Sequence, residues 1–430
     1  MHEFAYKNGR LFCEGVDLES IADTLGTPVY VYSAKTIREN FRRLDAALSG
    51  LPDRMICYAM KANSNLAVLD LLAREGAGFD IVSGGELYRV QRAGGDASRC
   101  TFAGVAKSRA EIEAALKAGV YCLNVESEAE MDRIGDVAAG LGMKAPVAVR
   151  VNPDVDAGTH EFISTGKSKN KFGVGLDRAR ALYERAAANK GLTIRGIQTH
   201  IGSQILSPQP FAEAISKLLP LVADLKAAYG IEFFSIGGGV GIVYEQALAS
   251  GTADWWSAAG AGHIAPADYA SAIVPLLAPL GLKILFEPGR FLVGNAGILL
   301  STVEYVKETP AKTFTIVDAG MNDLIRPALY EGWHEIVPLR EQPDAAMRPC
   351  DVVGPVCESG DFFAKDRPLP PLSEGDRIAV MSCGAYGSVM ASNYNTRRLA
   401  PEVLVDGDRH WTIRRRQEYA ELVAGESIFG

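Results

Sequence analysis

Lys61 closes an apolar run of strand length, and its position suggests chemistry. The run extends from Met55 to Met60, and a helix-like segment follows from about Leu66 to Arg74. A lysine at the mouth of a buried strand is expected to be desolvated, which lowers the pKa of its ammonium and favours Schiff-base formation. Taken alone, Lys61 is better explained as a solvated lysine at a strand end. Its neighbours along the chain change that interpretation.

Further polar residues follow other apolar runs at the point where each run ends. They occur in the motifs Phe79-Asp80-Ile81-Val82-Ser83, Val149-Arg150-Val151-Asn152-Pro153, Thr199-His200-Ile201-Gly202-Ser203 and Phe286-Glu287-Pro288-Gly289-Arg290. Taken singly, each has an ordinary structural explanation, and a lone histidine is as readily structural as catalytic. If these runs are the strands of a parallel barrel, their carboxyl ends meet at one face, where such barrels do their chemistry. The set therefore predicts one active-site rim.

The triple glycine Gly237-Gly238-Gly239 follows another apolar run and suits a phosphate group. Without side chains, the backbone can approach an anion closely and direct several N–H groups toward it. The run does not fit the GxGxxG pattern of dinucleotide sites. A phosphate cradle combined with a Schiff-base lysine, Lys61, indicates pyridoxal phosphate. Glu287 would then keep the pyridine nitrogen protonated, and His200 would stack on the ring.

Short apolar runs alternate with amphipathic helical patterns through the middle of the chain, which predicts βα units. The expected strands are 54–60, 78–82, 101–104, 121–125, 147–152, 194–200, 233–237 and 283–287. The expected helices include 108–118, 127–139, 177–189 and 211–228. Eight units over roughly 230 residues match a closed (β/α)8 barrel. A doubly wound open sheet is the alternative, but it would normally carry its glycine fingerprint after the first strand.

Beyond Arg290 the strand-like runs recur without long helices between them. They lie at 300–308, 313–319, 335–339, 350–356, 377–382, 402–406 and 410–415. This pattern predicts an antiparallel β-sandwich or β-barrel domain of roughly 130 residues. The strand-like run Val29-Tyr30-Val31-Tyr32 precedes the barrel and is expected to join this domain. The expected division is therefore an α/β barrel over 36–289 and a β domain formed by 1–35 and 290–430.

Composition excludes several classes of protein. The net charge of −8 argues against nucleic acid or an anionic membrane as the main partner. The seven cysteines form no CxxC pair, which suggests reduced thiols in a cytoplasm. The N-terminus has no signal-peptide character, and no apolar run approaches the ~20 residues of a membrane span. No metal site is expected.

The ordered set of motifs resembles the fold-type III pyridoxal-phosphate decarboxylases, and among them the diaminopimelate decarboxylases. The matching motifs begin at Tyr58-Ala59-Met60-Lys61-Ala62-Asn63 and continue with His200-Ile201-Gly202-Ser203-Gln204, Gly237-Gly238-Gly239, Glu287-Pro288-Gly289-Arg290, Asp318-Ala319-Gly320-Met321-Asn322-Asp323, Arg326-Pro327-Ala328-Leu329-Tyr330, Cys357-Glu358-Ser359-Gly360-Asp361 and Gly384-Ala385-Tyr386-Gly387. One local departure is Cys383, where a small residue such as alanine is expected. The resemblance implies decarboxylation of meso-2,6-diaminopimelate to L-lysine and carbon dioxide, the last step of lysine biosynthesis.

The resemblance also implies residue roles. The implied catalytic residues are Lys61, His200, Glu287 and Cys357. The implied pyridoxal-phosphate-binding residues are Lys61, Asp80, Arg150, His200, Ser203, Gly238, Gly239, Glu287, Gly289, Arg290 and Tyr386. The implied substrate-binding residues are Arg290, Arg326, Tyr330, Glu358 and Tyr386. Cys357 and Glu358 are implied to reach the partner subunit's site, so a homodimer with composite sites is expected.

The chemistry of the substrate agrees with these implied roles. Its non-reacting end carries a carboxylate and an ammonium, and two arginines suit bidentate binding of a carboxylate. A relative acting on ornithine has no distal carboxylate to bind, so two free arginines facing its pocket would be costly. Without the family resemblance, Arg326 is better explained by a structural salt bridge within the β domain.

Three alternatives remain at this stage. They are decarboxylation of another amino acid on the same scaffold, racemisation of an amino acid, and non-enzymatic binding of pyridoxal phosphate. A racemase needs a second base opposite the lysine, and the motif at 357–361 favours decarboxylation instead. Non-enzymatic pyridoxal-phosphate proteins lack the β domain. The polar segment 160–173 is expected to be either a closing lid or a solvated basic loop.

Overall fold

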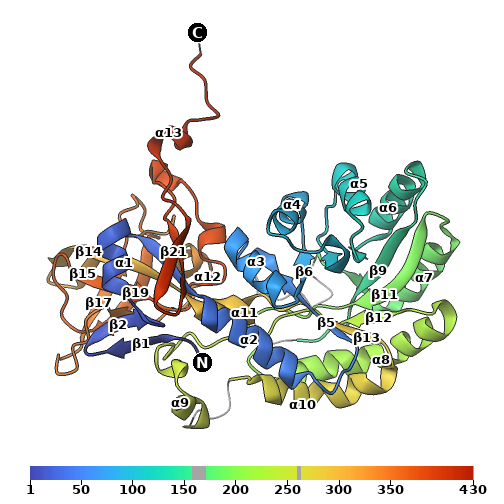
Figure 1. Ribbon diagram of the computed structural model, residues 1–430, viewed down its shortest axis with the longest axis horizontal. Helices are drawn as coiled ribbons and strands as arrows, with labels where there is room; N and C mark the ends of the chain where they lie inside the picture. Colours follow the sequence, from blue (N-terminus) through green and yellow to red (C-terminus); the bar gives the residue numbers. More distant parts are fainter. Residues whose placement is uncertain (157–170, 259–262, 430) are drawn as a thin grey trace. The chain divides into compact units, whose positions relative to one another are not determined.

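The computed structural model describes residues 1–156, 171–258 and 263–429 (Figure 1). The chain forms two compact units. One contains Asn40–Ile242 and Gly260–Leu292, and we call it the barrel unit. The other contains Met1–Glu39, Val243–Ala259 and Val293–Gly430, and we call it the β unit. The predicted segment 160–173 lies almost wholly outside the described residues.

The barrel unit has eight parallel strands that close on themselves, which confirms the predicted barrel. They are β5 (Arg54–Ala59), β6 (Gly78–Ile81), β7 (Cys100–Phe102), β8 (Cys122–Val125), β9 (Ala145–Asn152), β11 (Leu192–Gln198), β12 (Phe233–Ser235) and β13 (Lys283–Phe286). Neighbours in the chain pair in parallel, β13 pairs with β5, and β8 pairs with β9, so the sheet has no free edge among these strands. A further two-residue strand, β10 (Val174–Gly175), pairs with β9.

Helices surround these strands in the view of Figure 1. They include α3 (Leu66–Arg74), α4 (Gly84–Arg92), α5 (Arg109–Ala118), α6 (Glu128–Gly140), α7 (Leu176–Ala188), α8 (Gln209–Tyr229) and α10 (Pro266–Leu277). Serine N-caps begin three of them, and in α5 the Ser108 and Glu111 side chains form a full capping box. Gly119 ends α5 at φ 70°, a conformation that favours glycine. These local signals explain why the helix bounds agree closely with the pattern.

The interior of the barrel changes from apolar to polar toward the carboxyl ends of its strands. One apolar cluster there contains Met55, Cys57, Cys122, Ala148, Phe233 and Leu285. At a later level of the strands, Arg150 is the register partner of Gln198, and Gln198 is the partner of Ser235. Arg150 and Ser235 each stand two positions after a member of this cluster, Ala148 or Phe233, on the same strand, so polar side chains follow the apolar ones on the same face toward the carboxyl ends.

The β unit is built around one mixed sheet in the order β18-β17-β15-β14-β4-β20-β21, with β19 and β16 branching from β14. The strands are β4 (Val29–Ser33), β14 (Gly297–Glu308), β15 (Thr313–Val317), β16 (Ile336–Pro338), β17 (Arg348–Val353), β18 (Phe362–Leu369), β19 (Arg377–Val380), β20 (Glu402–Asp406) and β21 (Arg409–Arg414). As predicted, the N-terminal strand β4 joins this sheet. The expected purely antiparallel pairing is wrong at two places, because β15–β17 and β20–β4 are parallel.

Smaller elements complete the β unit. The strands β1 (Phe4–Lys7), β2 (Arg10–Cys13) and β3 (Val16–Asp17) form a separate antiparallel sheet beside α1 (Leu18–Leu25). The short helix α12 (Arg326–Tyr330) lies between β15 and β16 in the chain. Among the described residues, no helix is both long and apolar enough to cross a membrane, and no cluster of three potential metal ligands is found.

The segment Val243–Ala259 lies in the range predicted for the barrel but belongs to the β unit. Its contacts explain this difference. Ala247 is wholly buried in an apolar cluster with residues of β1 and β2, and its carbonyl contacts the His2 ring at 2.6 Å. The Leu248 N–H donates to the carboxylate of Glu335 at 2.6 Å. Because this segment falls between two barrel strands, the alternation of strands and helices could not show that it packs elsewhere.

Candidate active site

Lys61 and Asp80 meet at the end of adjacent strands in the barrel unit. Lys61 lies in the 3-10 turn that follows β5, and its Nζ is 3.2 Å from Asp80 Oδ2. The Asp80 side chain is 2% exposed, and its Oδ1 is buried without a hydrogen-bond partner among the described residues. The Lys61 side chain is 41% exposed, so the desolvation expected from its strand-end position is incomplete. An accessible amine is thus held by a buried carboxylate.

Glu287 is a second buried carboxylate in the barrel unit. Its two oxygens accept hydrogen bonds from Ser235 Oγ at 2.7 Å and from Gln198 Nε2 at 2.9 Å. Burial, with a smaller contribution from the charge of Asp80, raises the pKa of Glu287 to about 7, while the hydrogen bonds from Ser235 and Gln198 and the Lys61 charge oppose this rise. The carboxylate is thereby fixed in direction, and it holds a proton more tightly than an exposed glutamate does.

His200 follows β11 and contacts the glycine segment. Its Nδ1 accepts the Gly238 N–H at 3.2 Å, which leaves the proton of a neutral ring on Nε2. Burial, and then the nearby charges of Arg150 and Lys61, lowers the pKa of His200 well below its usual value. A neutral imidazole with one fixed tautomer is therefore expected at neutral pH.

The glycine segment is packed too tightly for side chains. A Cβ on Gly238 would lie 2.0 Å from the Glu287 carbonyl oxygen, and a Cβ on Gly239 would lie 2.4 Å from the Gly202 carbonyl oxygen. Gly239 also has φ 110°, which disfavours other residues. The glycines therefore bring the backbone between the ends of β11 and β13. This close approach is what an anion cradle of backbone N–H groups requires.

Two predicted arginines of the barrel unit are buried and are anchored by neighbouring side chains. Arg150 Nη1 lies 3.3 Å from both carboxylate oxygens of Glu126, and its guanidinium lies 4.9 Å from the centre of the Phe172 ring. Arg290, which is 6% exposed, donates from Nη2 to Ser203 Oγ at 3.0 Å. The structure thus links the predicted residues Arg290 and Ser203 directly.

The other predicted residues lie in the β unit, with Arg326 at the start of α12 and Tyr330 at its end. Arg326 is 7% exposed, and its Nη1 lies 2.7 Å from Nε2 of His334. Its guanidinium carbon lies 4.7 Å from the centre of the Tyr244 ring. In the described part of the chain, no carboxylate forms an ion pair with Arg326, so the structural salt bridge considered from sequence is not found.

Cys357 and Glu358 are exposed in the single chain. The Cys357 N–H donates to Asn395 Oδ1 at 3.0 Å, and Tyr394 Oη donates to Glu358 Oε2 at 2.9 Å. Tyr386 is partly buried and has φ 57°, a left-handed conformation that is unusual for tyrosine. These contacts order the surface that carries the predicted residues of this region.

Several residues that hold the predicted side chains escaped the sequence analysis. They are Ser235 and Gln198 at Glu287, Glu126 at Arg150, and His334 and Tyr244 at Arg326. For two of them a signal was present, since Gln198 stands two positions before His200 and Ser235 two positions before the triple glycine, within the strands predicted at 194–200 and 233–237. Residues two apart on a strand share a face, so both could have been assigned to the interior of the barrel.

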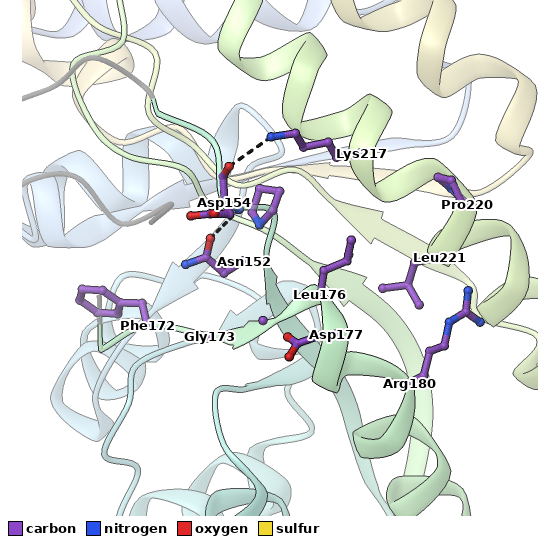
Figure 2. Close-up of a pocket in the computed structure, with 12 residues that line it drawn as sticks. Asn152, Asp154, Phe172, Gly173, Leu176, Asp177, Arg180, Lys217, Pro220 and Leu221 are labelled. Atoms are coloured by element: carbon purple, nitrogen blue, oxygen red, sulfur yellow. Dashed lines mark hydrogen bonds between the residues drawn. The ribbon is translucent and has the colours of Figure 1, made fainter. Parts of the chain in front are cut away.

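A separate pocket of about 930 Å³ opens in the barrel unit between the end of β9 and the helices α7 and α8 (Figure 2). Leu176 and Leu221 contribute apolar surface, and Lys217 donates to the Asp154 carbonyl oxygen at 3.1 Å. None of the predicted site residues lines it, so it forms no part of the candidate active site.

Comparison with known proteins shows which family the sequence of this chain matches. Residues 34–294 match the model of a family described as "Pyridoxal-dependent decarboxylase, pyridoxal binding domain". The chain is 52% identical to the diaminopimelate decarboxylase of Pseudomonas aeruginosa, with 100% of this chain and 99% of that protein covered. It is 47% identical to the diaminopimelate decarboxylase of Vibrio cholerae, with the same coverage.

Solved structures agree with these relatives. Diaminopimelate decarboxylase from Helicobacter pylori, complexed with L-lysine, is 42% identical and superimposes with a TM-score of 0.88 over 95% of this chain and 98% of that one. The diaminopimelate decarboxylase from M. jannaschii, in co-complex with L-lysine, is 36% identical with a TM-score of 0.90 over 100% of this chain and 99% of that one. The similarity therefore includes both units of the chain.

Proposed function

The chain belongs to the pyridoxal-dependent decarboxylase family, among the diaminopimelate decarboxylases, and from this premise we propose that it converts meso-2,6-diaminopimelate to L-lysine and carbon dioxide. It is a pyridoxal-phosphate-dependent carboxy-lyase. The observation that carries the choice of substrate is Arg326, a buried cation whose contacts in the β unit are an imidazole and an aromatic ring. Such a charge needs an anionic partner, and a distal substrate carboxylate supplies one.

The residues of the barrel unit fit pyridoxal phosphate. An accessible lysine stands beside a buried carboxylate with one unpartnered oxygen, and a second buried carboxylate is fixed by two donors. The glycine segment has no room for side chains, so its backbone alone is available there, as a phosphate site made of N–H groups requires. When bound, the cofactor supplies an electron sink for the electron pair released as the carbon–carboxylate bond breaks.

Each residue of the barrel unit then has a proposed part. Lys61 would hold the cofactor covalently through its amine and would be replaced there by the substrate amine. Glu287, held by Ser235 and Gln198, carries negative charge toward the pyridine nitrogen, and neutral His200 presents its flat ring to the cofactor. Asp80 keeps the Lys61 amine in place.

The remaining cofactor contacts are proposed for the phosphate and its surroundings. Backbone N–H groups next to Gly238 and at Gly239 bind phosphate oxygens, while the Gly238 N–H itself is donated to His200, and Gly289 leaves space for the chain to approach. Arg290 and Ser203, already joined by a hydrogen bond, add a charge and a hydroxyl. Arg150 and Tyr386 complete the proposed cofactor set.

The substrate's distal end is proposed to be bound by charge and hydrogen bonding. Arg326 and Arg290 bind its carboxylate, and Glu358 accepts hydrogen bonds from its ammonium. The hydroxyl groups of Tyr330 and Tyr386 donate further hydrogen bonds to this end of the substrate. Because the distal end of the substrate is held in place, the reacting carboxylate at the other end is oriented as well, and such remote contacts assist the chemical step. Cys357 is proposed as a proton donor, since an exposed thiol is more available than a buried one.

We also propose a homodimer in which Cys357 and Glu358 serve the partner subunit's site. Their exposure in the single chain supports this arrangement, because exposed side chains can be reached by a second subunit. All seven cysteines are unpaired thiols, which supports the proposed location in a reducing cytoplasm.

The test is a panel of substrates. Purified protein reconstituted with pyridoxal phosphate should release carbon dioxide from meso-diaminopimelate and far less from L-lysine, L-ornithine or L-arginine. Faster release from L-ornithine or L-arginine would favour decarboxylation of another amino acid on the same scaffold. Proton exchange at the substrate's Cα without carbon dioxide would favour a racemase.

A further inference from the structure

Arg326 is held by a histidine that neither the family assignment nor the sequence analysis singles out. His334 is wholly buried, and its Nε2 lies 2.7 Å from Nη1 of Arg326. The centre of the Tyr244 ring lies 4.7 Å from the guanidinium carbon of Arg326. The same ring meets the His334 ring edge-on, with 5.0 Å between the ring centres and an angle of 80° between the ring planes. A cation, an imidazole and a phenol ring thus form one packed group, the Arg326 cluster.

The hydrogen bonds of His334 determine its tautomer. Its Nδ1 lies 2.7 Å from the carbonyl oxygen of Met381, which can only accept a hydrogen bond, so Nδ1 carries a proton. Arginine can only donate, so Nε2 must be the acceptor for Arg326. His334 is therefore neutral in this arrangement, because a protonated imidazole would place two donors against each other.

The backbone of His334 is fixed at the same time. Its carbonyl oxygen accepts a hydrogen bond from Arg367 Nη1 at 2.6 Å. The next residue, Glu335, accepts the Met381 N–H at 2.8 Å, and the strand β16 that follows pairs with β19. An acceptor at a fixed place constrains the direction of one N–H of the guanidinium and therefore the plane of the whole group.

We propose that His334 is a positioning residue for substrate specificity, which orients Arg326 toward the distal carboxylate while leaving its charge uncompensated. The inference rests on the proposed function and gives a structural basis for its selectivity toward a substrate with a distal carboxylate. A carboxylate in place of His334 would also orient the guanidinium, but it would pair with the charge and compete with the substrate. A neutral acceptor fixes the geometry without that competition, and the ring of Tyr244 supports the same cation.

The test compares two inhibitors that differ in one group. L-lysine, the expected product, keeps the distal carboxylate, whereas cadaverine has the same chain and amines without any carboxylate. For His334→Leu we expect KM for meso-diaminopimelate and the inhibition constant of L-lysine to rise about 10- to 100-fold, the usual effect of losing a hydrogen bond to a charged group. Inhibition by cadaverine should be unchanged, and kcat should fall much less than KM rises.

Three further variants complete the design. His334→Gln keeps a neutral acceptor and should stay within a few-fold of wild type, while His334→Glu should weaken L-lysine inhibition at least as much as His334→Leu. Cys383→Ala is the matched control, because Cys383 Sγ lies 3.7 Å from the other ring nitrogen of His334 and, among the described residues, makes no hydrogen bond with Arg326. This variant should leave both inhibition constants unchanged.

The outcomes separate the inference from the proposed function. If wild-type protein does not decarboxylate meso-diaminopimelate, the proposed function is wrong whatever the variants do. If wild type is active and His334→Leu weakens both inhibitors equally, or neither, His334 does not position Arg326 and the inference is wrong. Should His334→Leu fail to fold, Tyr244→Leu removes the facing ring from a partly exposed position and must show the same selective loss for L-lysine; equal loss for cadaverine would overturn the inference.

Discussion

Replacing Glu287 with glutamine should make the cofactor-free protein more stable at pH 8 than wild type, by an amount that follows from the burial of this carboxylate. Glutamine keeps the shape and both neighbours, since Ser235 and Gln198 can each bond to an amide. What the substitution removes is the cost of ionising a buried acid. The free energy lost to this ionisation depends on pH, because the folded and unfolded chains lose the Glu287 proton at different pH values.

Burial and the Asp80 charge raise the pKa of Glu287 from 4.5 to about 7 in the folded chain. Below about pH 4.5 the group is protonated in both states and contributes no difference. Between pH 4.5 and 7 the folded chain retains the proton that the unfolded chain has lost, so the stability of the wild type falls as pH rises. Each unit of pKa difference corresponds to about 1.4 kcal/mol, so the full loss is about 3 kcal/mol above pH 7.

The assay is urea unfolding of cofactor-free wild type and Glu287→Gln at several pH values from 4.5 to 8. We expect the variant's advantage in unfolding free energy to grow by about 3 kcal/mol between about pH 4.5 and 7 and then to stay constant up to pH 8. Comparing the two proteins at each pH cancels the titration of the groups that the charge of Glu287 does not influence. Parallel stability curves would show that Glu287 titrates normally, and the argument from burial would then fail.

Three other changes test separate parts of the site. Gly238→Ala should abolish cofactor binding, seen as loss of the cofactor's absorbance from dialysed protein, because its Cβ would lie 2.0 Å from the Glu287 carbonyl oxygen; a variant that still retains cofactor would contradict the tight backbone approach. Arg326→Ala should weaken transition-state binding of meso-diaminopimelate, measured from kcat/KM, by about 2–4 kcal/mol without altering the cofactor spectrum. When L-lysine is the substrate its one carboxylate is the reacting group, so an equal loss on L-lysine would make Arg326 structural. Mixing Lys61→Ala with Glu358→Ala protein should restore about a quarter of wild-type activity if subunits share sites, and no recovery despite proven exchange would place each site in one chain.

The sequence predicted the barrel well because its strands are buried on all sides. Each of the eight predicted strands overlaps an observed one, and their bounds differ by at most two residues at either end. The strand ends also identified Lys61, His200 and Glu287, because a polar residue that interrupts a buried apolar run is conspicuous. These features depend on local pattern alone, which a single sequence contains.

Other features depend on contacts that local pattern does not contain. The strand β18 was missed because Lys365, Asp366, Arg367 and Pro368 break its alternation, and Asp366 has φ 48° where the pairing register shifts. The parallel pairs β15–β17 and β20–β4 depend on how the chain returns to the sheet. The supports of Glu287 come from 52 and 89 residues away, so only the fold brings them together.

A mass balance with the wild-type protein, pyridoxal phosphate and meso-diaminopimelate tests the proposed reaction most directly. Each molecule of substrate consumed should yield one carbon dioxide and one L-lysine, and Lys61→Ala protein should yield neither. Borohydride should fix the cofactor onto Lys61, as peptide mapping of the same wild-type sample would show. Substrate consumed without carbon dioxide, or cofactor fixed on another lysine, would refute the proposed reaction.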